Sequence, residues 1–117
     1  MNRKELGKLG EKYALDYLRS NNYEIIKVNY RCRYGEIDII AKEKNILVFV
    51  EVKTRTSDAF GKGLEAVDAK KQRKIKQVAL YFLNNYRKPV EDLRFDVIDV
   101  NIAPGHMPEL FHLKHAF

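Results

Sequence analysis

The chain has 117 residues, of which 45% are hydrophobic and 32% are charged, and its formal net charge is +6. We expect one domain over residues 1–117, since this length supports a single hydrophobic core. There is no run of about 18 apolar residues and no signal-peptide-like N-terminus, so we expect neither a membrane span nor secretion. A single cysteine, Cys32, excludes an intrachain disulfide and favours a cytoplasmic location.

The first predicted element is an amphipathic helix from Asn2 to about Asn21. Asn2 is a plausible N-cap, and Glu5 would complete a capping box. Gly10 lies within the apolar stripe and would let the helix approach a sheet closely. Glu11 lies at the border of this stripe, where a solvated glutamate is the ordinary interpretation. The stripe consists of apolar residues three and four positions apart: Leu6, Leu9, Tyr13, Ala14, Tyr17 and Leu18.

A first strand is predicted over Tyr23–Tyr30, followed by a turn over residues 31–35. Within this turn, Arg31, Arg33 and Tyr34 form a small cationic and aromatic cluster. Such a cluster could hold a phosphate and stack a base, or it could be an ordinary loop.

Two runs of β-branched and aromatic residues, Ile37–Ile40 and Ile46–Val52, predict a β-hairpin. We take Lys44 and Asn45 as its two loop residues, with the asparagine tolerating positive φ, so that residues 43 and 46 pair. Counting along this register places Asp38 directly opposite Glu51, with Cβ atoms ~5 Å apart.

Lys53 shares the face of Glu51, because alternate side chains of a strand point to the same side. Two buried, unpaired carboxylates repel each other, so Asp38 and Glu51 need a compensating charge. A divalent cation would supply it, and Lys53 would offset the charge of a water or phosphate alongside. A salt bridge between Lys53 and either carboxylate is the alternative.

The segment Thr56–Gly63 has two glycines and no periodicity. It is either a flap that contacts a substrate through Lys62 or a plain connector. A second amphipathic helix is predicted from about Leu64 to Tyr86, with its apolar face on the sheet. A stripe of its residues would face solvent: Lys70, Arg73, Lys74 and Gln77.

Positive charge is concentrated around this helix. Residues 52–88 hold ten Lys or Arg and three Asp or Glu, a net charge of +7, whereas residues 89–117 hold two and five. A basic surface predicts a polyanionic partner, although many charged faces are only solvated. The predicted nucleic-acid contacts are Arg31, Arg33, Arg55, Lys62, Lys70, Arg73 and Lys74.

A further strand is predicted over Leu93–Ile102. The helix before it makes a crossover, so this strand should pair in parallel with the strand over Ile46–Arg55. Asp96 within it is expected to hydrogen-bond at a strand end or, as the alternative, to support the acidic site of the hairpin indirectly. Glu109–Phe117 would be a short edge strand or a frayed tail. We do not expect a metal cluster from the three histidines of this region, His106, His112 and His115.

Residues 35–41 (GEIDIIA) and 49–55 (FVEVKTR) resemble the metal-site motif of the PD-(D/E)xK nuclease superfamily. In that motif an acidic residue on one strand precedes Glu-x-Lys on the next; Ile37 stands where the superfamily name has a proline. Together with Gly7-x-x-Gly10-Glu11 and residues 94–97 (RFDV), the chain resembles the YraN-like UPF0102 family, which is related to Holliday-junction resolvases. The resemblance implies an α/β, restriction-endonuclease-like α-β-β-β-α-β core, with a mixed sheet flanked by helices.

The resemblance also implies roles for particular residues. Asp38 and Glu51 would bind Mg²⁺ or Mn²⁺, with Glu11 and the backbone carbonyl of Val52 as further ligands. Lys53 would orient or deprotonate the attacking water. The implied function is a Mg²⁺-dependent endonuclease-like phosphodiesterase acting on branched or structured DNA, and a homodimer is left open. The alternatives are a non-catalytic nucleic-acid-binding module on the same fold and a scaffold whose charged triad is a buried salt bridge.

Overall fold

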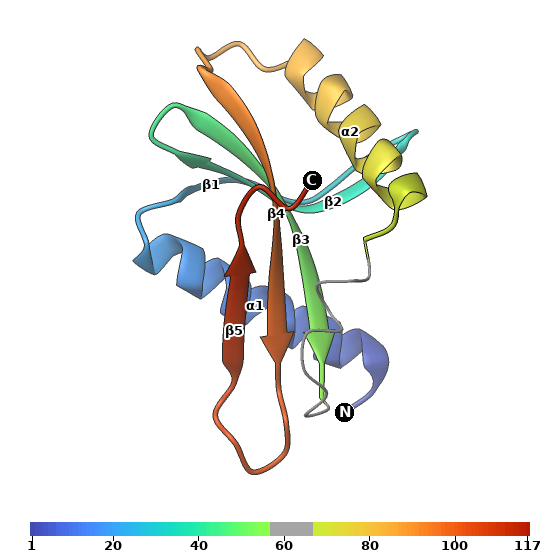
Figure 1. Cartoon of the computed structure of the whole chain (residues 1–117), viewed down its shortest axis with the longest axis vertical. Coiled ribbons are helices and arrows are strands. Elements are labelled where there is room, and N and C mark those ends of the chain that lie inside the picture. Colours follow the sequence, from blue (N-terminus) through green and yellow to red (C-terminus); the bar gives the residue numbers. More distant parts are fainter. Residues whose placement is uncertain (57–66) are drawn as a thin grey trace.

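The computed structural model describes residues 1–56 and 67–117 (Figure 1). These residues form a mixed α/β fold with two helices and one five-stranded sheet in the order β1-β2-β3-β4-β5. Neighbouring strands are antiparallel except β3 and β4, which are parallel and are connected through α2, as the crossover predicts. The elements are α1 (Arg3–Ser20), β1 (Glu24–Cys32), β2 (Gly35–Glu43), β3 (Ile46–Arg55), α2 (Ala69–Asn84), β4 (Asp92–Asn101) and β5 (Glu109–Leu113).

The two helices cover opposite faces of the sheet (Figure 1). Because side chains alternate along a strand, β3 contributes to both cores. Val48 and Val50 pack against α1, whereas Leu47 and Phe49 pack against α2. The long apolar run of β3 is thus buried on both sides, which explains why its sequence does not alternate with polar residues.

Helix α1 begins and packs as its sequence predicts. The side chain of Asn2 accepts a hydrogen bond from the backbone N–H of Glu5 at 2.9 Å. Gly10 is buried against β3, and a Cβ atom added to it would overlap the side chain of Thr54. The close approach expected at this glycine is therefore confirmed, and it holds the neighbouring Glu11 close to the sheet.

Helix α2 is shorter than predicted. It begins at Ala69 rather than Leu64, because the side chain of Asp68 accepts a hydrogen bond from the backbone N–H of Lys71 at 2.8 Å and caps the helix there. The helix ends at Asn84, two residues before Tyr86. The predicted flap and Lys62 lie, apart from Thr56, outside the described residues.

Strand boundaries also differ in detail. Strand β1 continues through Arg31 and Cys32, so the turn before β2 contains only two residues. In the β2–β3 turn, positive φ falls on Lys44 and not on Asn45 as expected. The side chain of Asn45 instead donates to Glu91 at 3.1 Å, which connects this turn to the start of β4. None of the helices in the described ranges is long and apolar enough to cross a membrane.

Candidate functional site

The site lies where β2 and β3 separate. Their pairing runs from Glu43↔Ile46 to Ile39↔Val50, the register predicted by counting, and stops one position before Asp38 and Glu51. Here the Asp38 carboxylate replaces the missing backbone partner, because its Oδ2 accepts a hydrogen bond from the N–H of Val52 at 2.8 Å. The separation exposes the end of the hairpin to two pockets, one on each side.

The pairing of β2 with its other neighbour, β1, is also interrupted at Asp38. The pairing between β1 and β2 passes from Val28↔Ile39 to Tyr30↔Ile37 and skips Asn29, which has a φ of 53°. This left-handed conformation within a strand is uncommon outside glycine. The Asn29 side chain donates to Oε1 of Glu11 at 2.8 Å and so reaches across to α1.

The carboxyl groups of Asp38 and Glu51 lie close enough for each to shift the pKa of the other. Burial, the hydrogen bond with Glu51 and the charge of Glu51 raise the pKa of Asp38 to about 8. The pKa of Glu51 is lowered, since the hydrogen bond from Asp38 and the ammonium of Lys71 outweigh burial. The side chain of Glu51 is only 11% exposed, and its Oε2 lies 2.6 Å from Nζ of Lys71. At neutral pH these shifts favour the protonated form of Asp38 and the ionised form of Glu51.

Two lysines complete the group. Burial and the neighbouring ammonium of Lys71 lower the pKa of Lys53. The pKa of Lys71 is raised, because its contact with Glu51 outweighs burial. Sequence reasoning placed Lys53 here but missed Lys71. The sequence signal that could have found Lys71 is its position, four residues before Ile75 and on the line of buried residues that runs along α2.

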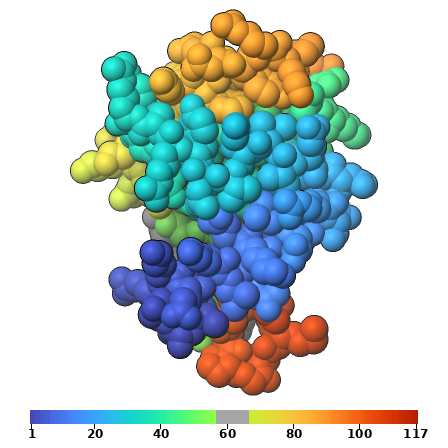
Figure 2. Space-filling view, turned by 180° about the vertical axis from the view of Figure 1, so that it is seen from behind, coloured from blue at the N-terminus to red at the C-terminus, as the bar shows by residue number. Residues whose placement is uncertain are grey.

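A larger pocket opens on the α1 side. It has a volume of about 440 Å³ and is lined in part by Glu11, Glu36, Asp38, Val52 and Thr54. In the space-filling view a notch separates the dark blue start of α1 from the teal atoms of strands β1 and β2, with green atoms of β3 behind it (Figure 2). Burial raises the pKa of Glu11, and the charge of Glu36 adds to this effect.

A smaller pocket of about 270 Å³ opens on the α2 side. Lys71, Lys74 and Glu51 line it together with Asp38, which thus borders both pockets.

Within the described residues no group of three His, Cys, Asp or Glu side chains is close enough to hold a metal ion. Glu11 shares a pocket with Asp38, and its negative charge contributes to the raised pKa of Asp38. The structure thus places Glu11 beside the acidic pair but does not join it to the pair.

Residues fitted to a cation are nevertheless present. The site holds two carboxyl groups whose negative charge is balanced by one proton and one lysine ammonium. A divalent cation could replace both of these and bind the two carboxylates. N–H and C=O of one residue in an extended strand face the same neighbouring strand. Because the N–H of Val52 faces Asp38, its carbonyl lies on that side as well. Asp38, Glu51 and the Val52 carbonyl are therefore the oxygen ligands that the site offers.

The predicted nucleic-acid contacts are spread around the two pockets. Arg31 is exposed beside the larger pocket and pairs with Glu36 at 2.8 Å. Lys74 lines the smaller pocket, and Lys70 and Arg73 are exposed on the same helix. Arg55 forms an ion pair with the buried Asp99 at 3.0 Å, so part of its charge is used within the fold. Arg33 lines neither of these two pockets but a third one, together with Tyr34.

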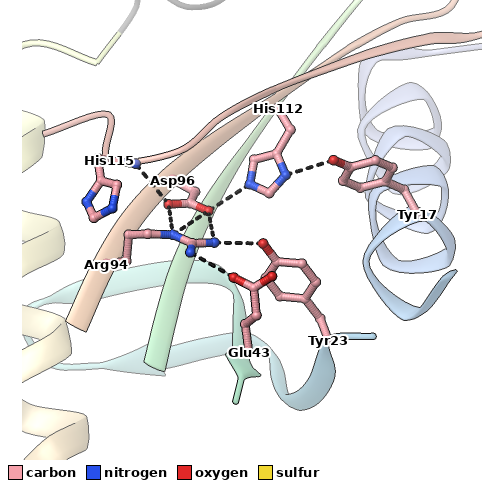
Figure 3. A network of polar contacts seen from close by, with 7 residues as sticks. All are labelled: Tyr17, Tyr23, Glu43, Arg94, Asp96, His112 and His115. Carbon is pink, nitrogen blue, oxygen red and sulfur yellow. Dashed lines mark hydrogen bonds and ion pairs between the residues drawn. The ribbon is translucent and has the colours of Figure 1, made fainter. Parts of the chain in front are cut away.

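A second polar cluster occupies the α1 side of β4 (Figure 3). Its centre is Asp96, a fully buried residue that accepts hydrogen bonds from Arg94 at 2.9 Å and lies 2.7 Å from Nε2 of His112. Arg94 also reaches Glu43 and Tyr23, at 2.9 and 2.7 Å. Asp96 is paired with Val50, whose side chain packs toward α1, so this cluster lies on the opposite face from Glu51 and Lys71.

Fold and site together define a mixed α/β protein with a half-buried pair of carboxyl groups at the open end of a β-hairpin. A model of the group described as "Uncharacterised protein family UPF0102" matches residues 10–100. The chain belongs to the UPF0102 family. It is 50% identical over 118 residues to a UPF0102 protein of Caldicellulosiruptor saccharolyticus, covering 100% of both chains.

Two further relatives have similar identities. A UPF0102 protein of Thermodesulfovibrio yellowstonii is 46% identical over 117 residues, which cover 100% of this chain and 99% of that one. A UPF0102 protein of Nocardia farcinica is 45% identical over 112 residues, which cover 96% and 88%. The family resemblance drawn from the sequence motifs is therefore confirmed at the level of UPF0102.

Proposed function

We propose that this protein is a Mg²⁺- or Mn²⁺-dependent phosphodiesterase that cleaves DNA, with branched or flapped structures as its substrates. The observation that carries the proposal is the half-buried Asp38–Glu51 pair, in which the pKa of Asp38 is raised and that of Glu51 lowered, beside Lys53, whose pKa is lowered. Groups with displaced pKa values in a pocket are typical of active sites. The exposed cations of α2 supply the attraction that a DNA backbone needs to approach acidic residues.

The fold supports the same proposal. The order of elements through β4 is α-β-β-β-α-β, with a helix on each face of the sheet, which is the arrangement expected for a restriction-endonuclease-like core. In this chain β5 adds an antiparallel edge strand beyond β4. The acidic pair then occupies the central hairpin, where the superfamily motif places its metal ligands.

Each residue has a separate role in the proposed reaction. Asp38, Glu51 and the carbonyl of Val52 would hold the cation, with Glu11 assisting from the α1 side. Asp38 must first release its proton, and Lys71 must leave Glu51. When bound, the cation would polarise the phosphate and lower the pKa of a bound water.

Lys53 acts on the proton of the attacking water. Its lowered pKa leaves a larger fraction of it uncharged, and so able to accept a proton, than in an ordinary lysine, and in its charged form it offsets the negative charge that develops on the phosphate. Lys53→Ala should therefore keep most of the DNA affinity, because one charge among many is lost. The chemical step should slow by ~10²-fold or more.

The deciding experiment combines metal binding with cleavage. Calorimetric titration with Mn²⁺ should show a site in the wild type that Asp38→Asn and Glu51→Gln weaken strongly. Linear, flapped and four-way DNA should then be incubated with Mg²⁺ and with Mn²⁺, and wild type should cut at least one of them. Equal metal affinity in all three proteins would refute the metal site, and equal cleavage by Lys53→Ala would refute the role of Lys53.

One observation favours a second candidate, a DNA-binding module without catalysis. The 2.6 Å contact of Lys71 with Glu51, together with the proton on Asp38, already balances the charge of the pair without a cation. Lys71→Met separates the two candidates. If a cation must displace this ammonium, the variant should bind Mn²⁺ more tightly than wild type. If wild type binds all three DNA structures and cuts none, the binding module is correct.

A further inference from the structure

We propose that the pocket between the β1–β2 turn and α2 binds an unpaired DNA base next to the cleavage position. This inference rests on the proposed function for its substrate, DNA, and adds the part of the substrate that is recognised. The pocket has a volume of about 350 Å³, within the size range of small-ligand sites. Its lining residues are Arg33, Tyr34, Gln77, Leu80, Tyr81 and Asn84.

The pocket wall is aromatic and accessible. Tyr34 from the turn and Tyr81 from α2 meet edge to face, with ring centroids 6.0 Å apart. Tyr34 is 40% exposed, Tyr81 37% and Leu80 61%. These are three of the seven large hydrophobic residues that are exposed in the described part of the chain. Single exposed aromatic side chains are normal on a protein surface, whereas several of them grouped in one pocket indicate a binding surface.

The polar groups of the pocket suit a nucleotide. The guanidinium of Arg33 lies over the Tyr34 ring, 4.9 Å from its centroid, and donates to the Tyr34 hydroxyl at 2.8 Å. A fixed cation at the edge of an aromatic surface can hold a phosphate while the base stacks. The amides of Gln77 and Asn84 are exposed and can donate to or accept from the edge of a base.

The pocket adjoins the acidic site on both of its walls. Tyr34 lines this pocket and the next residue, Gly35, lines the smaller acidic pocket. On α2, Lys74 lines the acidic pocket and Gln77 and Tyr81 line the aromatic one. These helix positions are three and seven residues apart, a rise of ~4.5 to ~10.5 Å. A stacked strand advances ~3.4 Å per nucleotide, so the aromatic pocket lies about one to three nucleotides from the proposed cleavage position.

This placement selects a class of substrate. In an intact duplex the bases are stacked inside the helix and cannot enter a pocket beside the backbone. An unpaired nucleotide at a flap or junction can present its face to the two tyrosines. The aromatic pocket would therefore favour branched DNA by reading an unstacked base, while the cations of α2 hold the phosphates of either form.

The test measures binding in EDTA, so that cleavage plays no part. A duplex with a short single-stranded flap is the probe, and its bases are replaced one at a time by abasic sites. Wild type should bind the probe more weakly when the abasic site falls at one or two positions near the branch. Tyr81→Leu and Tyr34→Leu should each weaken binding of the intact flap by about 5- to 150-fold, the loss expected for one stacked base.

The variants should also become insensitive to the abasic sites, which a merely structural role would not produce. Tyr81→Phe keeps the ring and should bind like wild type. Phe111→Leu, at a residue 56% exposed on β5, is the matched control for loss of an exposed aromatic and should change nothing. Wild-type binding that ignores every abasic site overturns the base pocket but leaves the proposed cleavage intact. If binding depends on the base but no DNA is cleaved, the base pocket is supported and only the proposed enzymatic activity is refuted.

Discussion

Asp38 keeps a proton under conditions in which an ordinary aspartate is ionised, because burial and Glu51 raise its pKa to about 8. A carboxyl whose pKa is higher in the folded than in the unfolded protein binds more protons when folded. Its contribution to stability is complete below the unfolded pKa near 3.8 and is lost as the pH rises to about 8. Glu51, whose pKa is lowered, acts in the opposite direction but only near and below its ordinary pKa of 4.5, so above that value Asp38 makes the folded protein less stable as the pH rises.

Asp38→Asn should remove this dependence, because an amide keeps the shape of the protonated acid without the proton. We expect the variant to have a higher free energy of unfolding than wild type at pH 8, in the absence of metal. A pKa displaced by one unit is worth about 1.4 kcal/mol, so a gain of about 1 kcal/mol or more is expected. Urea unfolding at several pH values between 4 and 9 measures it.

Glu24→Gln provides the control for this measurement, since Glu24 is an exposed residue at the start of β1. This variant should keep the wild-type decline in stability with pH. If Asp38→Asn declines as steeply as wild type, the proton is not held on Asp38.

At this scale the sequence identified only part of the site. Asp38, Glu51 and Lys53 could be placed from the register of one hairpin, because strand pairing follows from counting. Lys71 and Asn29 could not. Lys71 reaches Glu51 only because α2 packs on the face of the sheet to which Glu51 points, and a left-handed asparagine within a strand leaves no trace in periodicity. Both depend on tertiary contacts that local sequence patterns do not encode.

Helix α1 positions Glu11 through its close contact with β3. Gly10→Ala would drive a methyl group into Thr54, so helix and strand must move apart. Such overpacking costs about 1–3 kcal/mol, and it should also weaken metal binding by moving Glu11 away from Asp38. Thermal or urea unfolding, followed by Mn²⁺ titration, tests both effects.

Gly7 on the same helix is a matched control, because a Cβ atom there would meet nothing within 4 Å. Gly7→Ala should stabilise the protein by about 0.5–1 kcal/mol through its better helix propensity. Equal effects of the two substitutions would mean that the approach of α1 to β3 is not set by Gly10.

Helix α2 carries the exposed cations expected to attract DNA. Replacing Lys70, Arg73 and Lys74 by Ala should lower DNA affinity and flatten its dependence on salt, by up to ~0.9 log units per lost phosphate contact. Binding isotherms at several salt concentrations measure the slope. A variant with three other exposed cations replaced, Arg19, Lys27 and Lys44, loses the same charge and should keep the wild-type slope. Equal slopes in the two variants would show that the α2 face is only solvated.

The elements themselves were largely predictable, and the reason is periodicity. Both helices, β1 through β4 and the parallel pairing of β3 with β4 follow from apolar spacing and from the length of the crossover. The end of α2 nearest the site was misplaced, because a capping side chain at Asp68 overrides an apolar residue at Val67. Helix starts depend on such single hydrogen bonds.

In the molecule as a whole, the two helices bring separate groups to one point of the sheet. Glu11 approaches Asp38 from the α1 side, and Lys71 approaches Glu51 from the α2 side. The separation of β2 from β3 lets Asp38 border both pockets. Ionisation of the pair is therefore coupled to the stability of the whole fold and to whatever cation replaces the proton.

This coupling predicts that the stabilising effect of a metal depends on pH. Binding a cation requires Asp38 to lose its proton, so the apparent affinity should rise with pH up to about 8. At a metal concentration of about 100 Kd the folded state gains ~2.7 kcal/mol, which corresponds to a Tm increase of roughly 10 °C for a chain of this size. Since the metal-free protein loses stability over the same pH range, Mg²⁺ or Mn²⁺ should flatten the decline.

Thermal unfolding with and without Mn²⁺, at pH 6 and pH 8.5, measures this effect. We expect a small Tm increase at pH 6 and a large one at pH 8.5, and none at either pH for Asp38→Asn. Calorimetry in buffers with different ionisation enthalpies should show close to one proton released per cation near pH 7, because Asp38 is mostly protonated there. A Tm increase that is the same at both pH values, or that survives in Asp38→Asn, would place the cation elsewhere on the protein.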